Sequence, residues 1–163
     1  MTEREKAKEI MLSDDEREEI EREILRSGVK RGASLEALRI VQKYRGWVSD
    51  EIHDTAELLG MTSAELDAIA TFYSLIFRKP VGKHVILICD TVSCWVMGYD
   101  KILERLTQRL GIGINETSAD GQFTLLQVAC LGVCDRAPAM MIGEELFTDL
   151  TPEKVDEILG HYK

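Results

Sequence analysis

The first half of the chain has the apolar spacing of short amphipathic helices. Apolar residues in the segment 34–44 recur at i, i+3, i+4 and i+7, the spacing of a buried helical stripe. Ser13, followed three residues later by Glu16, predicts a capping box that begins a largely acidic, exposed helix over 14–25. Further helices are predicted after residue 50 and from Ser63. The positions expected to face inward in the second and fourth helices are Ala37, Ile40, Val41, Tyr44, Leu66, Ile69, Ala70 and Tyr73.

The pattern changes at residues 78–82, where Pro80 and Gly82 interrupt the helical period. We therefore predict an N-terminal helical domain over residues 1–80 and a second domain over 81–163. In the second domain, a continuous apolar run over 84–89 predicts a strand covered on both faces, followed by a helix over 99–110 and a strand over 123–129. Short strands over 139–142 and 145–147 precede a last helix that begins at Thr151-Pro152.

This βαββα order predicts that the strands over 84–89 and 123–129 are parallel neighbours joined by a right-handed crossover. The fold class is therefore α+β: a small N-terminal helical bundle followed by an α/β domain with a four-stranded mixed sheet. Each of the two parallel strands runs into a cysteine at its carboxyl end, where open α/β sheets usually bind ligands.

Charge and composition exclude several partners. The 20 basic and 29 acidic side chains give a net charge of −9, which repels nucleic acid and anionic lipid headgroups. The first ten residues lack the apolar core of a secretion signal and the acid-poor character of a transit peptide, and no apolar run reaches membrane-spanning length. The sequence therefore predicts a reducing, cytoplasmic setting with no direct membrane contact.

The cysteines carry the candidate chemistry. Cys89 and Cys94 form C-x4-C, Cys130 and Cys134 form C-x3-C, and the chain has no other cysteine. In a reducing compartment four thiols are more often metal ligands than disulfide partners, and thiolates suit iron-sulfur clusters, zinc and copper(I). We interpret the four cysteines as ligands of one [2Fe-2S] cluster. Gly132 either lets backbone N–H groups approach sulfur or forms a plain turn.

Other interpretations of the cysteines differ in how well the spacing suits them. A structural four-cysteine zinc site is permitted by the spacing and stays open. A redox dithiol needs C-x-x-C, and neither pair has two intervening residues. A Rieske centre needs two histidines beside two cysteines, whereas His53, His84 and His161 are not spaced in this way and are expected to be packed or exposed. No arrangement of residues supports bond chemistry, so we predict no catalytic residues and no substrate site. The side chains of Trp95, Met97, Met140 and Met141 are expected in the core or as a shield around the metal.

Three sequence stretches carry a family resemblance: C-D-T-V-S-C at 89–94, C-L-G-V-C-D at 130–135 and A-T-F-Y-S-L-I-F at 70–77. With the order of elements, they make the chain similar, over nearly its whole length, to the E subunits of bacterial NADH-quinone oxidoreductase, respiratory complex I. The resemblance implies a thioredoxin-like second domain and a [2Fe-2S] cluster on Cys89, Cys94, Cys130 and Cys134. Pro138 matches a position that is often cis in such folds, although the sequence does not determine the isomer.

The resemblance also implies a function in an oxidoreductase complex. The chain would exchange single electrons with FMN on a flavoprotein subunit that binds NADH, beside other peripheral-arm subunits on the cytoplasmic side of the inner membrane. The matching subunit of an NAD-linked hydrogenase or formate dehydrogenase is an alternative with the same chemistry. A structural zinc adaptor, which binds zinc through the four cysteines and holds a complex together without redox work, is the alternative from another class.

Overall fold

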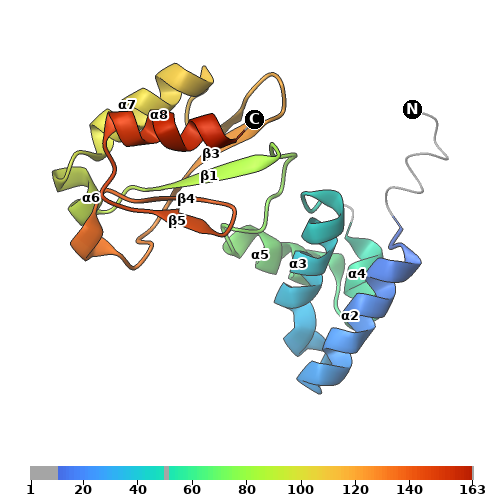
Figure 1. Cartoon of the computed structure of the whole chain (residues 1–163). Helices are drawn as coiled ribbons and strands as arrows, with labels where there is room; N and C mark the ends of the chain where they lie inside the picture. The colour runs from blue at the N-terminus through green and yellow to red at the C-terminus, as the bar shows by residue number, and fades with distance from the viewer. Residues whose placement is uncertain (1–10, 50–51, 163) are drawn as a thin grey trace. The chain divides into compact units, whose positions relative to one another are not determined.

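The computed structural model describes residues 11–49 and 52–162. The expectation that residues 1–10 form neither a secretion signal nor a transit peptide therefore lies outside the described residues. The chain divides into two compact units, Met1–Pro80 and Val81–Lys163 (Figure 1). The first unit is helical in its described part, and the second contains the sheet. No helix in the described ranges is both long enough and apolar enough to cross a membrane.

Capping residues define the helices of the first unit. Ser13 and Glu16 form the predicted capping box. Thr62 and Glu65 form a second capping box, in which Thr62 is the cap residue of the helix that begins at Ser63, as predicted. Gly46 ends the segment that begins at Ser34, in the left-handed conformation that suits glycine. The elements are α2 (Asp14–Ser27), the 3₁₀ helix η1 (Lys30–Ala33), α3 (Ser34–Arg45), α4 (His53–Leu58) and α5 (Ser63–Phe72).

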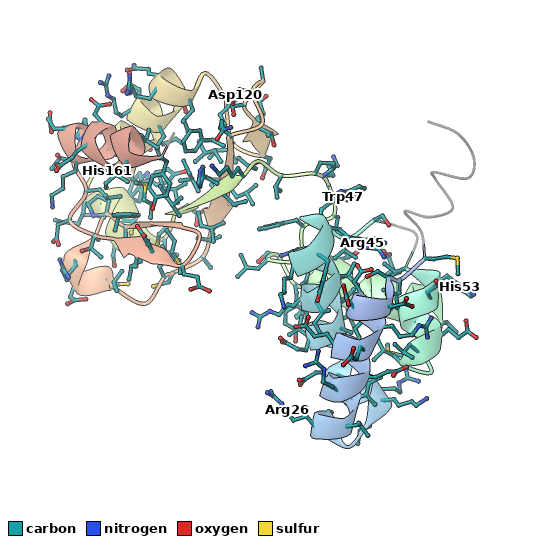
Figure 2. The ribbon with its side chains drawn as sticks, turned by 45° about the vertical axis from the view of Figure 1, so that its right-hand side comes forward. Arg26, Arg45, Trp47, His53, Asp120 and His161 are labelled. Carbon is teal, nitrogen blue, oxygen red and sulfur yellow. The ribbon has the colours of Figure 1, made fainter. Side chains whose placement is uncertain are left out.

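The core of the first unit corrects the expectation that the acidic first helix is merely exposed. Ile20 of α2 is completely buried, and Glu16 is buried beside it. The carboxylate of Glu16 accepts hydrogen bonds from Arg45 Nε at 2.6 Å and from the terminal nitrogen of Arg45 at 2.9 Å. Arg45 is labelled in Figure 2. Because a buried charge needs a partner, this pair lets an acidic helix pack against α3.

Two tyrosines expected to face inward are exposed instead. The Tyr44 hydroxyl donates a hydrogen bond to Glu19 Oε2 at 3.0 Å, at the surface of α3. Tyr73 follows the last residue of α5 with extended backbone angles, so it leaves the helical face that buries Leu66 and Ala70. Both tyrosines lie at the end of a helix, where the regular spacing of inward-facing positions no longer determines the direction of a side chain.

The second unit contains a five-stranded sheet with the order β2-β3-β1-β4-β5. Strands β1 and β3 are parallel neighbours, as predicted, and the other pairs are antiparallel. The prediction of four strands was wrong because β2 has two residues, both exposed, and so shows no alternation. The strands are β1 (His84–Cys89), β2 (Glu116–Thr117), β3 (Phe123–Val128), β4 (Met140–Ile142) and β5 (Glu145–Phe147).

Helices α7 (Tyr99–Leu110) and α8 (Pro152–His161) lie side by side on one face of the sheet (Figure 1). Arg105 Nε donates to Asp156 Oδ1 at 3.0 Å and ties the two helices together. The last four residues of β1 are buried, as predicted for a strand covered on both faces. The core combines side chains from the sheet and both helices: Ile86, Ile88, Ile102, Leu106, Leu125 and Val155.

Candidate metal centre

The parallel pair β1 and β3 places the cysteine clusters at one edge of the sheet. Cys89 is the last residue of β1 and pairs in register with Val128, the last residue of β3. Cys130 follows two residues later, so the two strands direct their following segments to the same region. The Ala137–Pro138 peptide that leads into β4 is cis.

Cys94 and Cys134 lie on short helices. Cys94 is the central residue of α6 (Val92–Val96), and Cys134 begins the 3₁₀ helix η2 (Cys134–Arg136). A helix of five residues has too few positions to show an amphipathic period, so the sequence pattern did not reveal α6. Its single turn places Cys94 inward while its neighbours face outward.

The four thiols fall into an inner and an outer pair. Cys89 and Cys94 are each 2% exposed, whereas Cys130 and Cys134 are exposed. All four are free thiols, and the sulfurs of Cys130 and Cys134 are 3.2 Å apart. In the described ranges no three His, Cys, Asp or Glu side chains gather closely enough to hold a single metal ion.

The buried thiol of Cys89 is surrounded by hydrogen-bond donors. Burial alone would raise its pKa, but hydrogen bonds from the hydroxyl and backbone of Thr91, from Cys94 and from the backbone of Leu131 hold that pKa below its ordinary value. The Thr91 oxygen lies 3.1 Å from the Cys89 sulfur. Leu131 belongs to the other cysteine segment, so its contact joins the two segments at the inner pair.

The remaining sulfurs are linked in the same way. Burial and the neighbouring Cys89 raise the pKa of the Cys94 thiol to about 11, against an opposing hydrogen bond from the backbone of Ala139. The pKa of Cys134 is raised by Cys130, while a hydrogen bond from Ser93 opposes the shift. Because Ser93 belongs to α6, this contact joins the two segments a second time, at the outer pair.

Gly132 combines both roles that the sequence left open. Its φ of 83° lies in the left-handed region, as a turn between Cys130 and Cys134 requires. Its N–H donates to the sulfur of Cys130 at 3.3 Å. Backbone N–H groups aimed at sulfur are the surroundings that thiolate-bound iron-sulfur clusters use. A sulfur-only donor set with such N–H groups therefore fits a [2Fe-2S] cluster.

Sequence reasoning missed the hydroxyls of Thr91, which contacts the Cys89 sulfur in its own segment, and of Ser93, which faces Cys134 of the other segment. Their only signal was two small hydroxyl residues between Cys89 and Cys94. Trp95 and Met97 were expected in the core or as a shield around the metal; the core alternative was wrong, because Trp95 on α6 and Met97, which caps it, are 60% and 61% exposed. Met140 is completely buried, as core packing requires.

The histidines lie apart from the cysteines in their own surroundings. His53 begins α4 in the first unit, and His161 ends α8 in the second; both are exposed (Figure 2). The ring of His84 packs against Tyr162 and Phe123, with centroid distances of 5.0 and 5.5 Å. The expectation that the histidines are packed or exposed is therefore confirmed.

Known proteins resemble this chain over nearly its whole length. It is 46% identical over 154 residues to the E subunit of the NADH-quinone oxidoreductase of Pseudomonas aeruginosa, with 94% of this chain and 93% of that protein covered. It is 50% identical over 153 residues to the corresponding E subunit of Escherichia coli strain K12, with 93% and 92% covered.

A solved structure shares the fold. A chain of an NAD⁺-reducing [NiFe]-hydrogenase in the air-oxidised state aligns with a TM-score of 0.69 at 22% identity, covering 79% of this chain and 22% of that chain. A family model described as thioredoxin-like [2Fe-2S] ferredoxin matches residues 20–163, which include all four cysteines. The chain therefore belongs to the thioredoxin-like [2Fe-2S] ferredoxin family.

Proposed function

We propose that this chain is the electron-transfer subunit of an NADH-quinone oxidoreductase and holds one [2Fe-2S] cluster on Cys89, Cys94, Cys130 and Cys134. The observation that supports it most is that β1 and β3 are parallel neighbours, so that the chain segments carrying the two cysteine pairs leave the sheet at the same edge. The contact of the Leu131 backbone with the Cys89 sulfur supports it further, because it links the two segments. The identities of 46% and 50% to E subunits favour a quinone oxidoreductase over the hydrogenase, whose chain is 22% identical.

The end of β1 and α6 supply the inner thiols, and the segment after β3 supplies the outer thiols, so each of these two parts of the chain would hold one iron. When bound, the cluster supplies a one-electron redox couple. Burial of Cys89 and Cys94 keeps water from the inner sulfurs. The backbone N–H groups of Leu131, Gly132 and Ala139 offset the negative charge that four thiolates bring together.

The outer pair lies at the protein surface, where an electron partner can approach. Beside it, α6, which also carries Cys94 and Ser93, and its C-cap residue expose four apolar side chains: Val92, Trp95, Val96 and Met97. Contiguous exposed apolar side chains are typical of protein interfaces. We infer that the flavoprotein subunit, which binds FMN and NADH, covers α6 within the peripheral arm, on the cytoplasmic side of the membrane.

The ligand set is tested with Cys130→Ser, using full-length protein purified without oxygen. Wild type should contain iron and acid-labile sulfide in equal amounts and give a rhombic EPR signal after dithionite reduction. Cys130→Ser should lose or change this signal while far-UV circular dichroism shows the helices intact. Ala129→Ser introduces the same side chain at the preceding exposed position and should leave the spectrum unchanged.

Two results would contradict the proposal. An unchanged EPR signal in Cys130→Ser would remove Cys130 from the ligand set. Zinc in place of iron, with no EPR signal in the reduced wild type, would favour the structural zinc adaptor instead.

A further inference from the structure

Thr91 occupies a helix-capping position without capping the helix. It is the N-cap of α6, with φ −79° and ψ 166°, and its carbonyl accepts the first helical hydrogen bond from Trp95 N–H at 2.9 Å. A threonine hydroxyl at this position normally accepts a hydrogen bond from a backbone N–H in the first turn. The Thr91 side chain makes no such bond, and its oxygen lies 3.1 Å from the Cys89 sulfur instead. The hydroxyl is therefore directed to the metal centre, and the first turn of α6 has no hydrogen bond from a capping side chain.

The chemistry of a ligating cysteine fixes the direction of this hydrogen bond. A free thiol and a hydroxyl can each donate to the other, but a cysteine that binds metal is a thiolate without a proton. Once Cys89 is a ligand, the Thr91 hydroxyl must donate to the sulfur. A donor to thiolate withdraws negative charge from it, and this stabilisation is greater when the site carries an additional electron.

Burial makes this hydroxyl difficult to replace. Cys89 is 2% exposed, so water has little access to its sulfur if the hydroxyl is removed. Ser93 offers the contrasting case, because its hydroxyl lies near Cys134, where it opposes the rise that Cys130 causes in the pKa of an exposed thiol. Water can take the place of the Ser93 hydroxyl at that surface. The two hydroxyls between the first pair of cysteines should therefore differ in effect, with Thr91 the stronger.

We propose that Thr91 is a positioning residue whose hydroxyl holds the Cys89 sulfur and raises the reduction potential of the metal centre. This inference rests on the proposed [2Fe-2S] function. It assigns to Thr91 a role that a helix cap or a packing residue would not have. Because the side chain does not cap α6, replacing Thr91 by valine keeps its branched shape and removes only the donor.

The test compares midpoint potentials of full-length, cluster-containing variants by EPR-monitored redox titration. Thr91→Val should make reduction about tenfold less favourable, which is a downward shift of about 59 mV for a one-electron couple. Thr91→Ser retains the hydroxyl and should stay near wild type, and Ser93→Ala should shift less than Thr91→Val. Thr107→Val is the matched control, since the Thr107 hydroxyl donates to Leu103 O at 2.9 Å on α7, away from sulfur.

A second measurement reads the hydrogen bond directly. Pulsed ENDOR in D₂O should detect exchangeable deuterons of the backbone N–H groups near the reduced centre in every variant. Wild type and Thr91→Ser should show one further exchangeable coupling, from the hydroxyl, that is absent from Thr91→Val. If Thr91→Val assembles no cluster while Thr91→Ser does, the need for the donor is confirmed. If both variants fail to assemble a cluster, Thr91 acts through packing and the proposal is wrong.

The outcomes separate this inference from the proposed function. A wild-type protein without an iron-sulfur signal would overturn the function itself. A normal wild-type signal with equal potentials in Thr91→Val, Thr107→Val and wild type would overturn only the role of Thr91.

Discussion

Gly82 lies where the second unit begins its sheet, and replacing it by alanine should disturb the strand pair that carries the cysteines. A Cβ built on Gly82 would lie 2.8 Å from both the backbone nitrogen and the carbonyl carbon of Phe123, and 3.0 Å from the carbonyl carbon of Gln122. The N–H of Gly82 also donates to the Thr124 hydroxyl at 2.6 Å. All three crowded atoms belong to the backbone at the start of β3, so no side-chain rotation can relieve the contact.

The cost follows from the movement of backbone that Gly82→Ala requires. Overpacking of a well-packed interior typically costs 1–3 kcal/mol, and we expect about 2 kcal/mol for Gly82→Ala. This corresponds to a roughly thirtyfold loss in the folding equilibrium constant of the second unit. The β1 and β3 backbones should separate first near their beginnings, at the end of the pair opposite Cys89.

Hydrogen exchange measured on peptides from β1 and β3 reports this opening, and urea unfolding gives the total change. Gly160→Ala is the matched control, because Gly160 lies in α8 with no atom within 4 Å of its built Cβ and no positive φ. That substitution should stabilise the unit by about 0.5–1 kcal/mol. Equal protection of β1 and β3 in Gly82→Ala and wild type would refute the steric reasoning.

Two further predictions concern charge in the first unit and the exposed helix of the second. Burial raises the pKa of Glu16, but its hydrogen bonds with Arg45 and Ser13 outweigh burial and lower this pKa below the ordinary value. Ionised Glu16 therefore stabilises the folded state at pH values above its ordinary pKa, and this stabilisation is lost as pH falls through the pKa of the folded state. Glu16→Gln should lower the free energy of unfolding by about 3 kcal/mol at neutral pH. In urea titrations at several acidic pH values, this free energy should fall less steeply with decreasing pH in Glu16→Gln than in wild type, and an equally steep fall would contradict the reasoning. Trp95→Ala should change the free energy of unfolding by less than about 0.5 kcal/mol but weaken binding to the proposed flavoprotein partner by about 2 kcal/mol, measured by calorimetry. Leu146→Ala, at an exposed apolar position on β5, is its control, and equal affinities of the two variants would argue against α6 as the interface.

The sequence predicted those parts of the fold in which burial repeats over several residues. The strand His84–Cys89 and the helix Tyr99–Leu110 have the predicted bounds, because their apolar residues face one continuous core. The parallel pairing of β1 and β3 followed from the strand-helix-strand order, and it placed Cys89 and Cys130 at the same edge.

Shorter features were beyond a periodicity argument. Strand β2 is two residues long, and α6 is a single turn in which Cys94 faces inward and Trp95 outward. The contact of Thr91 with Cys89 depends on a side-chain rotamer, and that of Ser93 with Cys134 also depends on a second chain segment, so the sequence shows the two hydroxyl residues but not their partners. The cis peptide before Pro138 likewise depends on tertiary context.

Mössbauer spectroscopy of full-length protein assembled with ⁵⁷Fe tests the central claim most directly, because it reports the oxidation state, ligand type and coupling of each iron. The account predicts tetrahedral, sulfur-coordinated ferric sites coupled to a diamagnetic ground state, with one site becoming ferrous on reduction by a single electron. A lone paramagnetic iron, or zinc with no ⁵⁷Fe bound, would contradict the claim that Cys89, Cys94, Cys130 and Cys134 together hold a [2Fe-2S] cluster.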